Sequence, residues 1–208
     1  MKIPAPPDDH NLDLQPLIKL GQSQRFAAGQ VVFHEGDIGT SLYVLRQGQV
    51  RVVGQSETGK ELILNTIGAG QILGEMTLDG GTRSATVVAL EDCQCTSIPN
   101  RVVHAHMREH PEFALQMLLL VISRARNATQ KAKDMALTDV YARLSKTLTL
   151  LAGSDEAIAP KITHSTLAQM VGSSREMVSK LMKDLEKGGY VQSAADKLVL
   201  CRRLPTRW

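Results

Sequence analysis

Hydrophobic and polar positions alternate with a short period in the first half of the chain. Between residues 20 and 98, short apolar runs are separated by glycines, in the segments VVFHEG, SLYVLRQG, VRVVG, ELILNTIG and TVVAL. Runs of this length bounded by glycine are typical of β-strands. Because no long helical repeat interrupts them, we predict an antiparallel, jelly-roll-like β-roll rather than a parallel α/β sheet.

A long helix is predicted from about Pro111 to Leu137. Proline suits the first turn of a helix. Small or apolar residues then recur at alternating steps of four and three: Leu118, Ile122, Ala125, Thr129, Ala132 and Ala136. This spacing is typical of a coiled-coil seam and predicts a homodimer. The alternative is a helix that packs only on its own roll, through Phe113, Leu115, Leu119 and Leu120.

Two short amphipathic helices, joined at a glycine, follow in residues 162–185. Leu167, Ala168 and Val171 form the inner side of the first helix, Gly172 permits a left-handed turn, and Ser173 or Ser174 can cap the second helix. This pattern indicates a helix-turn-helix. The alternative is an ordinary surface helix with charge pairs such as Glu176 with Lys180. The segment after it predicts a hairpin wing, in which residues 190–192 pair with residues 198–200.

Length and charge agree with two domains. The chain has 208 residues, of which 43% are hydrophobic, which is enough for a core in each domain. Residues 139–208 hold 11 Lys and Arg against 7 Asp and Glu, whereas residues 1–138 hold 13 against 14. The basic surplus therefore lies with the predicted helix-turn-helix, as expected for a partner rich in phosphate.

We expect neither a signal peptide for export nor a membrane-spanning segment. The first residues lack the apolar core of a signal peptide, and no run of about 18 uncharged apolar residues exists. Three cysteines without a CxxC pair argue against a disulfide framework. We therefore expect a cytoplasmic protein.

The segment Gly74–Ala85 carries the candidate ligand chemistry. Gly74 allows close approach of a ligand to the backbone, Glu75 can accept from a ribose hydroxyl, and Arg83 with Ser84 can clamp a phosphate. By spacing alone, a structural ion pair between Glu75 and Arg83 is an equal alternative. No nucleophile elbow or Walker loop is present, so we do not expect an enzyme.

The order of these parts resembles the cyclic-AMP receptor protein/FNR family of bacterial transcription regulators. The resemblance rests on FAAGQVVFHEGD, LYVLRQGQV, GEM with RSA, the long helix and SSRE in the helix-turn-helix, and it covers roughly residues 20–200. It implies an α+β protein with an effector-binding β-roll in residues 1–110, a dimerisation helix and hinge in residues 111–138, and a winged helix-turn-helix in residues 139–208.

The resemblance also implies the ligand and its site. The effector would be cyclic AMP, with its ribose at Gly74 and Glu75, its phosphate at Arg83 and Ser84, and Met76 within the same segment. Two adjacent hydroxyl residues of the dimer helix read the adenine in the cyclic-AMP receptor protein, and their counterparts are Ala128 and Thr129. The loop between Glu75 and Arg83 is shorter than in that protein, and Leu73 stands where Phe often precedes the Gly-Glu pair.

For DNA, the resemblance places Arg175, Glu176 and Lys180 at the positions that read a palindrome with guanine-containing half-sites. Ser179 is similar to the FNR-type reader. The full predicted set is Thr163, Ser174, Arg175, Glu176, Ser179, Lys180 and Lys183. RNA polymerase is an expected further partner.

Two other hypotheses remain open at this point. Within the family, the regulator could be constitutive or could sense another effector. From another class, it could be a haem or redox sensor that uses Cys93 and Cys95. No histidine shares a recognisable ligand spacing with either cysteine, so we expect no metal.

Overall fold

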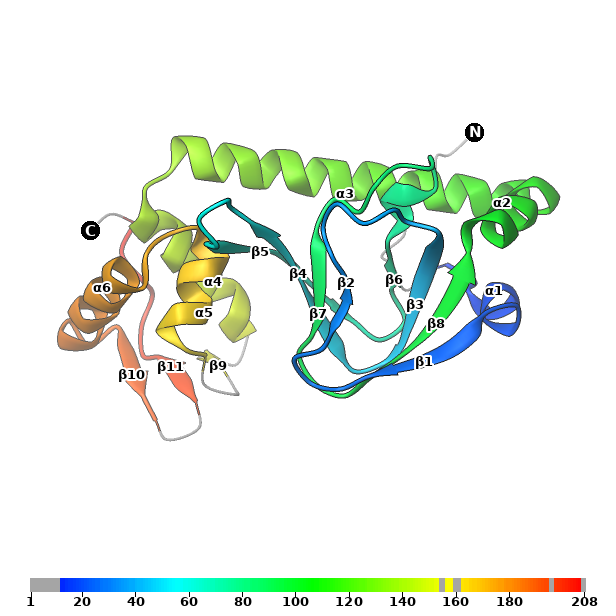
Figure 1. Ribbon diagram of the computed structural model, residues 1–208. Helices are drawn as coiled ribbons and strands as arrows, with labels where there is room; N and C mark the ends of the chain where they lie inside the picture. The colour runs from blue at the N-terminus through cyan, green and yellow to red at the C-terminus, as the bar shows by residue number, and fades with distance from the viewer. Residues whose placement is uncertain (1–11, 154–155, 159–161, 195–196, 207–208) are drawn as a thin grey trace. The chain divides into compact units, whose positions relative to one another are not determined.

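A computed structural model describes residues 12–153, 156–158, 162–194 and 197–206. The chain separates into two compact units, Met1–Ala128 and Thr129–Trp208, with the boundary inside one helix. Figure 1 shows strands and helices of the first unit in blue to green and those of the second in yellow to red. No helix of the described residues is long and apolar enough to cross a membrane.

The first unit is built on two antiparallel sheets. One sheet has the order β1-β8-β3-β6 and the other β2-β7-β4-β5. Their strands are β1 (Gln22–Phe26), β2 (Val31–Phe33), β3 (Ser41–Gln47), β4 (Gln49–Gln55), β5 (Glu61–Gly68), β6 (Ile72–Leu73), β7 (Thr86–Ala89) and β8 (Cys93–Pro99). The predicted β-roll is confirmed.

Alternating side chains of these strands fill the space between the sheets. The buried cluster there consists of Leu45, Val50, Ile67, Leu73, Val87, Ala89, Cys93 and Cys95. Five strands fall on the five predicted apolar runs. Strands β1, β6 and β8 were not predicted, because β1 has mainly polar residues, β6 has only two residues, and β8 contains few strongly apolar ones.

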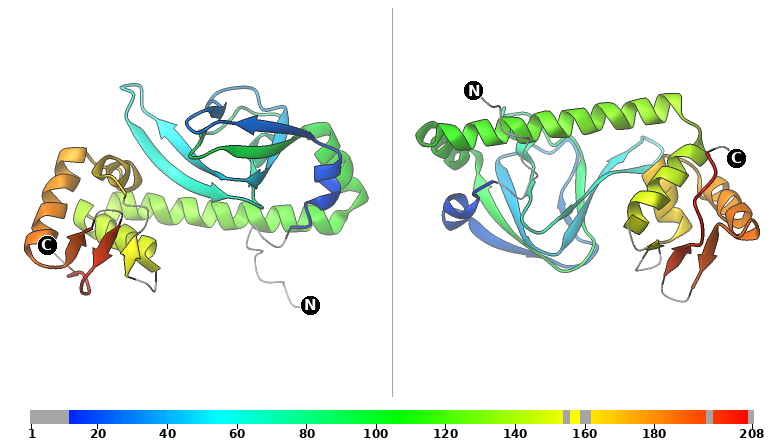
Figure 2. Two further views of the ribbon diagram at one scale, coloured as in Figure 1. Left: turned by 90° about the horizontal axis from the view of Figure 1, so that it is seen from below. Right: turned by 180° about the vertical axis from the view of Figure 1, so that it is seen from behind.

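Helices cover one side of this unit. They are α1 (Gln15–Lys19), α2 (Asn100–Glu109) and α3 (Pro111–Leu137), and α1 lies beside α2 in both figures of the whole chain (Figures 1 and 2). The predicted bounds of α3 are confirmed. Phe113, Met117 and Leu120 of α3 are buried in a cluster with residues of α1, α2 and β3. Leu115, expected on this inner side, is 50% exposed, so Met117 takes its place.

The described residues of the second unit form the end of α3, a small sheet and three further helices. The further elements are α4 (Val140–Ala152), β9 (Ala157–Ile158), α5 (His164–Val171), α6 (Arg175–Lys187), β10 (Val191–Ser193) and β11 (Leu198–Leu200). Asp139 caps α4, because its side chain accepts from the Ala142 N–H at 2.7 Å. The helices α5 and α6 meet at a tight corner (Figure 2).

The hairpin wing exists with a small correction. Strand β10 begins at Val191, because the Tyr190 N–H donates to the Leu185 carbonyl at 2.9 Å and so closes the end of α6. The wing also has a third strand: β9 pairs with β11 through Ile158 and Leu198. On either side of β9, residues 154–155 and 159–161 lie outside the described part of the chain.

Candidate functional site

Gly74 shapes the turn that precedes the short 3-10 helix η2 (Glu75–Thr77). Its backbone is left-handed, with φ 78° and ψ 18°. The Gly74 carbonyl accepts from Thr77 Oγ1 at 2.9 Å and from Arg83 Nη1 at 3.1 Å. A Cβ atom at this position would collide with the Arg83 guanidinium. The position therefore requires glycine both for its dihedral angles and for the approach of Arg83.

Arg83 is a buried cation held by neutral partners. Its residue is 5% exposed, Nη2 donates to the Ser41 carbonyl at 2.6 Å, and Nη1 donates to Thr77 Oγ1 at 3.2 Å. The guanidinium lies 4.1 Å from the centre of the Phe33 ring and 5.7 Å from that of Tyr43. Burial lowers its pKa, but an arginine starts so far above neutrality that it stays charged.

Within the described residues, no carboxylate lies within 4.0 Å of the Arg83 nitrogens. The predicted alternative, an ion pair between Glu75 and Arg83, is therefore not formed. The three hydrogen bonds to Gly74, Thr77 and Ser41 use three of the five N–H donors of a guanidinium. A buried cation without a carboxylate in direct contact, and with donors left over, suits an anionic ligand.

Glu75 pairs instead with an arginine of α3. Its side chain is 7% exposed, and Oε2 lies 2.5 Å from Arg124 Nη1. Arg124 Nη2 also donates to the Ile72 carbonyl at 3.0 Å, so both residues are fixed. Sequence reasoning missed Arg124, because 49 residues separate it from Glu75. The one available signal was its place four residues before Ala128, on the helix face predicted to meet the nucleotide base.

The other side chains of the predicted ligand site are exposed, unlike those of Glu75 and Arg83. Ser84 is exposed, and its hydroxyl donates to Met76 Sδ at 3.2 Å, while Met76 itself is 61% exposed. Gly74, Glu75, Met76, Arg83 and Ser84 thus come together in one place. Thr129 is exposed and begins the second unit, so its contact with a ligand stays a prediction.

The cysteines do not have the surroundings of reactive thiols. Cys93 and Cys95 are 4% and 0% exposed. Burial raises the pKa of Cys95 to about 12, so it stays a thiol at neutral pH, whereas redox chemistry and metal binding need the thiolate. The residues that the structure describes contain no cluster of three or more potential metal ligands. The burial of both thiols argues against a redox role for Cys93 and Cys95.

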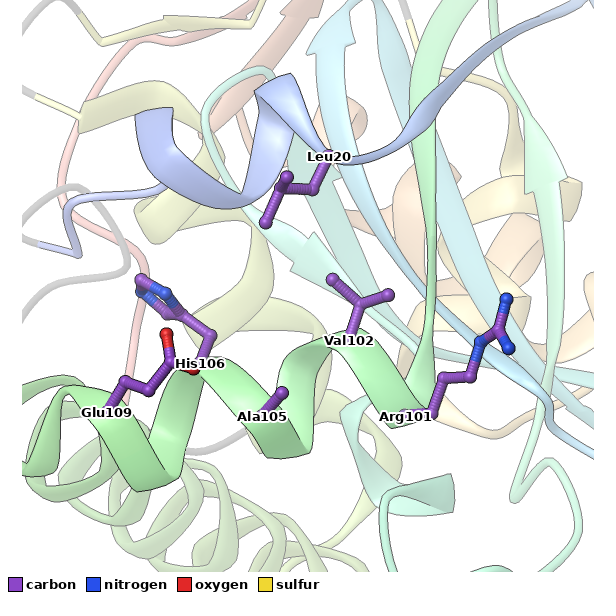
Figure 3. Close-up of a pocket in the computed structure, with 6 residues that line it drawn as sticks. All are labelled: Leu20, Arg101, Val102, Ala105, His106 and Glu109. Carbon is purple, nitrogen blue, oxygen red and sulfur yellow. The ribbon is translucent and has the colours of Figure 1, made fainter.

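A separate hollow lies between α1 and α2 (Figure 3). Its lining residues are Leu20, Arg101, Val102, Ala105, His106 and Glu109, none of which belongs to the predicted ligand site. His106 is only 8% exposed. Its ring packs on those of His110 and Phe113, at centroid distances of 4.3 and 4.9 Å. Burial lowers the pKa of His106.

The helix-turn-helix has the local geometry that its sequence predicts. Gly172 ends α5 with φ 62° and ψ 48°. Ser174 caps α6 by accepting from the Met177 N–H at 3.2 Å, and Thr163 caps α5 by accepting from the Thr166 N–H at 3.1 Å. Among the apolar side chains of α6, Val178, Met182 and Leu185 are buried, whereas Leu181 is partly buried and Met177 is 45% exposed. The hydroxyls of both caps are therefore committed to their helices.

The charged residues predicted to read DNA stand out from α6. Arg175, Glu176, Lys180 and Lys183 are all exposed. Hydrogen bonds from its own backbone N–H and from Ser174 lower the pKa of Glu176, so this carboxylate is firmly ionised at the helix N-terminus. Ser179 differs from them, because it is half-buried and its hydroxyl lies 3.0 Å from His164 Nδ1.

Two parts of the chain match known protein families. Residues 23–110 match the cyclic nucleotide-binding domain family, and residues 142–203 match the Crp-like helix-turn-helix domain. The cAMP-activated global transcriptional regulator CRP of Haemophilus influenzae is 31% identical over 184 residues, which cover 85% of this chain and 82% of that protein. The chain belongs to the CRP/FNR family of transcription regulators.

A second relative and a solved structure are also similar to this chain. A CRP-like cAMP-activated global transcriptional regulator of Mycobacterium tuberculosis is 30% identical, with the same coverage of 85% and 82%. The solved structure of the c-di-GMP responsive global regulator CLP of Xanthomonas campestris has a TM-score of 0.82 at 23% identity, over 91% of this chain and 98% of its own. At that identity the likeness establishes the fold alone.

As a CRP/FNR regulator, the chain joins a cyclic nucleotide-binding domain to a DNA-binding helix-turn-helix domain. The matched range of the first includes the whole segment from Gly74 to Ser84, and that of the second includes every predicted DNA contact from Thr163 to Lys183. Members of the family are transcription regulators rather than enzymes.

Proposed function

We propose that this protein is a homodimeric transcription regulator that binds palindromic DNA under the control of cyclic AMP. The observation that carries the proposal is the buried guanidinium of Arg83, which lacks a carboxylate within 4.0 Å among the described residues. The name of the Haemophilus influenzae relative, a cAMP-activated regulator, supports the choice of ligand.

The cyclic phosphate would occupy the remaining N–H donors of Arg83, with the Ser84 hydroxyl beside it. The ribose would lie against Gly74, which has no side chain to keep it away, and would donate a hydroxyl to Glu75. Arg124 holds the Glu75 carboxylate in place before any ligand arrives. Met76, exposed next to Ser84, would cover one side of the nucleotide.

Arg124 gives the ligand a route to the dimer. It belongs to α3, so a ribose held by Glu75 is connected to the helix that bears the seam residues. Of these, Leu118 is 54% exposed, and the later ones from Ala125 onward are also exposed, as a surface covered by a second copy would be. Ligand would then favour one dimer geometry, in which two recognition helices lie about 34 Å apart.

On DNA, Arg175, Glu176, Ser179 and Lys180 would meet base edges. Thr163, Ser174 and Lys183 would lie by the phosphates, where the basic surplus of the second unit favours binding. A regulator of this kind acts where the chromosome is, so we place it in the cytoplasm. RNA polymerase is the partner through which it would change transcription.

Calorimetry of the nucleotide-stripped protein tests the effector. We expect heat with cyclic AMP, and a loss of affinity of roughly 10- to 150-fold in Arg83→Ala, because hydrogen bonds to charge contribute about 1.5–3 kcal/mol. Arg46→Ala, which removes an exposed arginine of β3, is the matched control and should bind as the wild type does.

Several outcomes would contradict the proposal. Wild-type affinity in Arg83→Ala would exclude this site for the phosphate. DNA binding without any response to cyclic AMP would identify a constitutive regulator or another effector, and cyclic GMP and cyclic di-GMP titrated in parallel would separate these cases. Glu75→Ala should weaken cyclic AMP more than its 2′-deoxy analogue, because only the first carries the hydroxyl.

A further inference from the structure

Two polar side chains from different helices meet inside the helix-turn-helix. His164 is the first residue of α5, Ser179 lies in the middle of α6, and Nδ1 of the one is 3.0 Å from Oγ of the other. Both residues are half-buried, whereas Arg175, Glu176 and Lys180 around them on α6 are exposed. Ser179 is thus held by the protein before DNA arrives.

Ser179 also lies on the side of α6 that should face the bases. It follows Arg175 by four residues, which places the two side chains one above the other on the same helix face. An unrestrained serine hydroxyl can donate to a base or accept from one, so by itself it discriminates weakly. Whatever fixes its hydrogen therefore decides which base edge it prefers.

One tautomer of the imidazole would fix that hydrogen. The first helix of a helix-turn-helix crosses the DNA backbone, so a side chain at its start faces phosphate oxygens, which only accept hydrogen bonds. When Nε2 carries the proton toward a phosphate oxygen and the ring is neutral, Nδ1 is an acceptor. Ser179 consequently donates to Nδ1 and has only its lone pairs left for the base.

We propose that His164 is a positioning residue that makes Ser179 an acceptor, so that Ser179 selects a base presenting an amino group in the major groove. The amino groups available there are N4 of cytosine and N6 of adenine. The inference rests on the proposed reading of DNA by α6 and adds to it a residue of α5 that never touches a base.

The test begins by locating the base. Selection from a random library with the wild type and with Ser179→Ala identifies the position of the half-site at which the loss of the hydroxyl relaxes the preference. At that position the amino group is then deleted, by placing purine for adenine or pyrimidin-2-one for cytosine. In separate duplexes, N7 of the purine in the same base pair is replaced by carbon.

Equilibrium binding at one salt concentration is measured for each duplex. In the wild type, deletion of the amino group should cost about 2- to 12-fold more than it costs Ser179→Ala, the value of one neutral hydrogen bond. His164→Phe keeps a flat ring but has no acceptor, and it should behave as Ser179→Ala does. Adding His164→Phe to Ser179→Ala should change nothing further at this position.

Ser165→Ala, an exposed neighbour of His164, serves as the control and should keep the wild-type preference. If His164→Phe keeps the guanine preference that Arg175 provides, the variant is folded. His164→Gln, which restores a polar side chain of different geometry, gives a second variant and should recover at most part of the preference.

The inference fails if His164→Phe keeps the wild-type sensitivity to the amino group, or if the N7 atom rather than the amino group carries the Ser179 preference. It also fails if Ser179→Ala relaxes no position. In each case an intact effect of Arg175→Ala on one guanine would leave the proposed DNA reader standing. If Arg175→Ala also changed no preference, the proposed function of α6 would itself be wrong.

Discussion

Arg83 in the first unit and Arg175 in the second illustrate two ways of presenting a guanidinium. Arg83 is 5% exposed and is surrounded by carbonyls, a hydroxyl and two aromatic rings before any ligand binds. Arg175 is exposed at the first position of α6. The cost of desolvating Arg83 is met during folding, whereas Arg175 would lose its water only on DNA.

Substitutions near the two arginines should therefore affect different properties of the protein. Changes around Arg83 alter a preorganised site and should affect ligand affinity and the stability of the fold together. Changes at Arg175 should leave folding intact and alter only the choice of DNA.

Gly74→Ala should break the effector site. The added Cβ collides with the Arg83 guanidinium, so cyclic AMP affinity should fall by about as much as in Arg83→Ala, roughly 1.5–3 kcal/mol. The left-handed backbone should also lower the free energy of unfolding by about 1–2 kcal/mol. Calorimetry and denaturant unfolding measure the two effects.

Gly29→Ala is the matched control for this strain. Gly29 has φ +82° and nothing within 4 Å of a Cβ, so the variant should lose similar stability but bind cyclic AMP normally. Equal loss of affinity in the two glycine variants would mean that backbone strain, and not the displacement of Arg83, disables the site.

Arg175→Ala should change specificity without changing the fold. Loss of a bidentate contact should relax the preference at one guanine of each half-site by about 1–3 kcal/mol, while the unfolding transition stays within experimental error. Selection from a random library measures the preference. Lys183→Ala, if it loses a phosphate contact, should instead weaken all sequences alike and reduce the salt dependence.

Substitutions at Ala128 and Thr129 of α3 should have a moderate effect on the choice between adenine and guanine. A single hydroxyl at Thr129 should distinguish adenine from guanine less well than two, by roughly one neutral hydrogen bond, or about 0.5–1.5 kcal/mol. Ala128→Thr should widen the gap between cyclic AMP and cyclic GMP affinities, and Thr129→Ala should narrow it. Unchanged affinities and an unchanged DNA response in Thr129→Ala would exclude α3 as the base reader.

The smallest effect should come from the titration of His106. Because burial lowers its pKa in the folded protein, the unfolded chain takes up the proton first as the pH falls. This contribution to stability is therefore present above the unfolded pKa of about 6.5 and is lost as the pH falls below it. The free energy of unfolding should decrease between about pH 7.5 and about pH 5.5, and less steeply in His106→Gln.

His34→Gln, at an exposed histidine, should keep the wild-type slope. Parallel slopes in all three proteins would show that the burial of His106 has no energetic consequence.

Several features follow from neighbouring residues and could be predicted from sequence. The bounds of α3 and a serine cap at the start of α6 were predicted correctly, because a cap depends on a hydrogen bond between residues three apart. The five glycine-bounded apolar runs were also correct. Strands β1 and β9 were not predicted. Strand β1 has five mainly polar residues and β9 has only two residues, so neither shows an apolar period.

Contacts between distant residues could be decided only by the tertiary structure. Sequence supplied the residue types at Glu75 and Arg83 and left open whether they pair; the fold gave Glu75 to Arg124 and placed Arg83 on the Ser41 carbonyl. Ser179 looked as free as its charged neighbours until α5 brought His164 to it. Local hydrogen bonds set the helices and turns, but the partner of a buried charge or a half-buried hydroxyl depends on how separate elements pack, which no short window of sequence records.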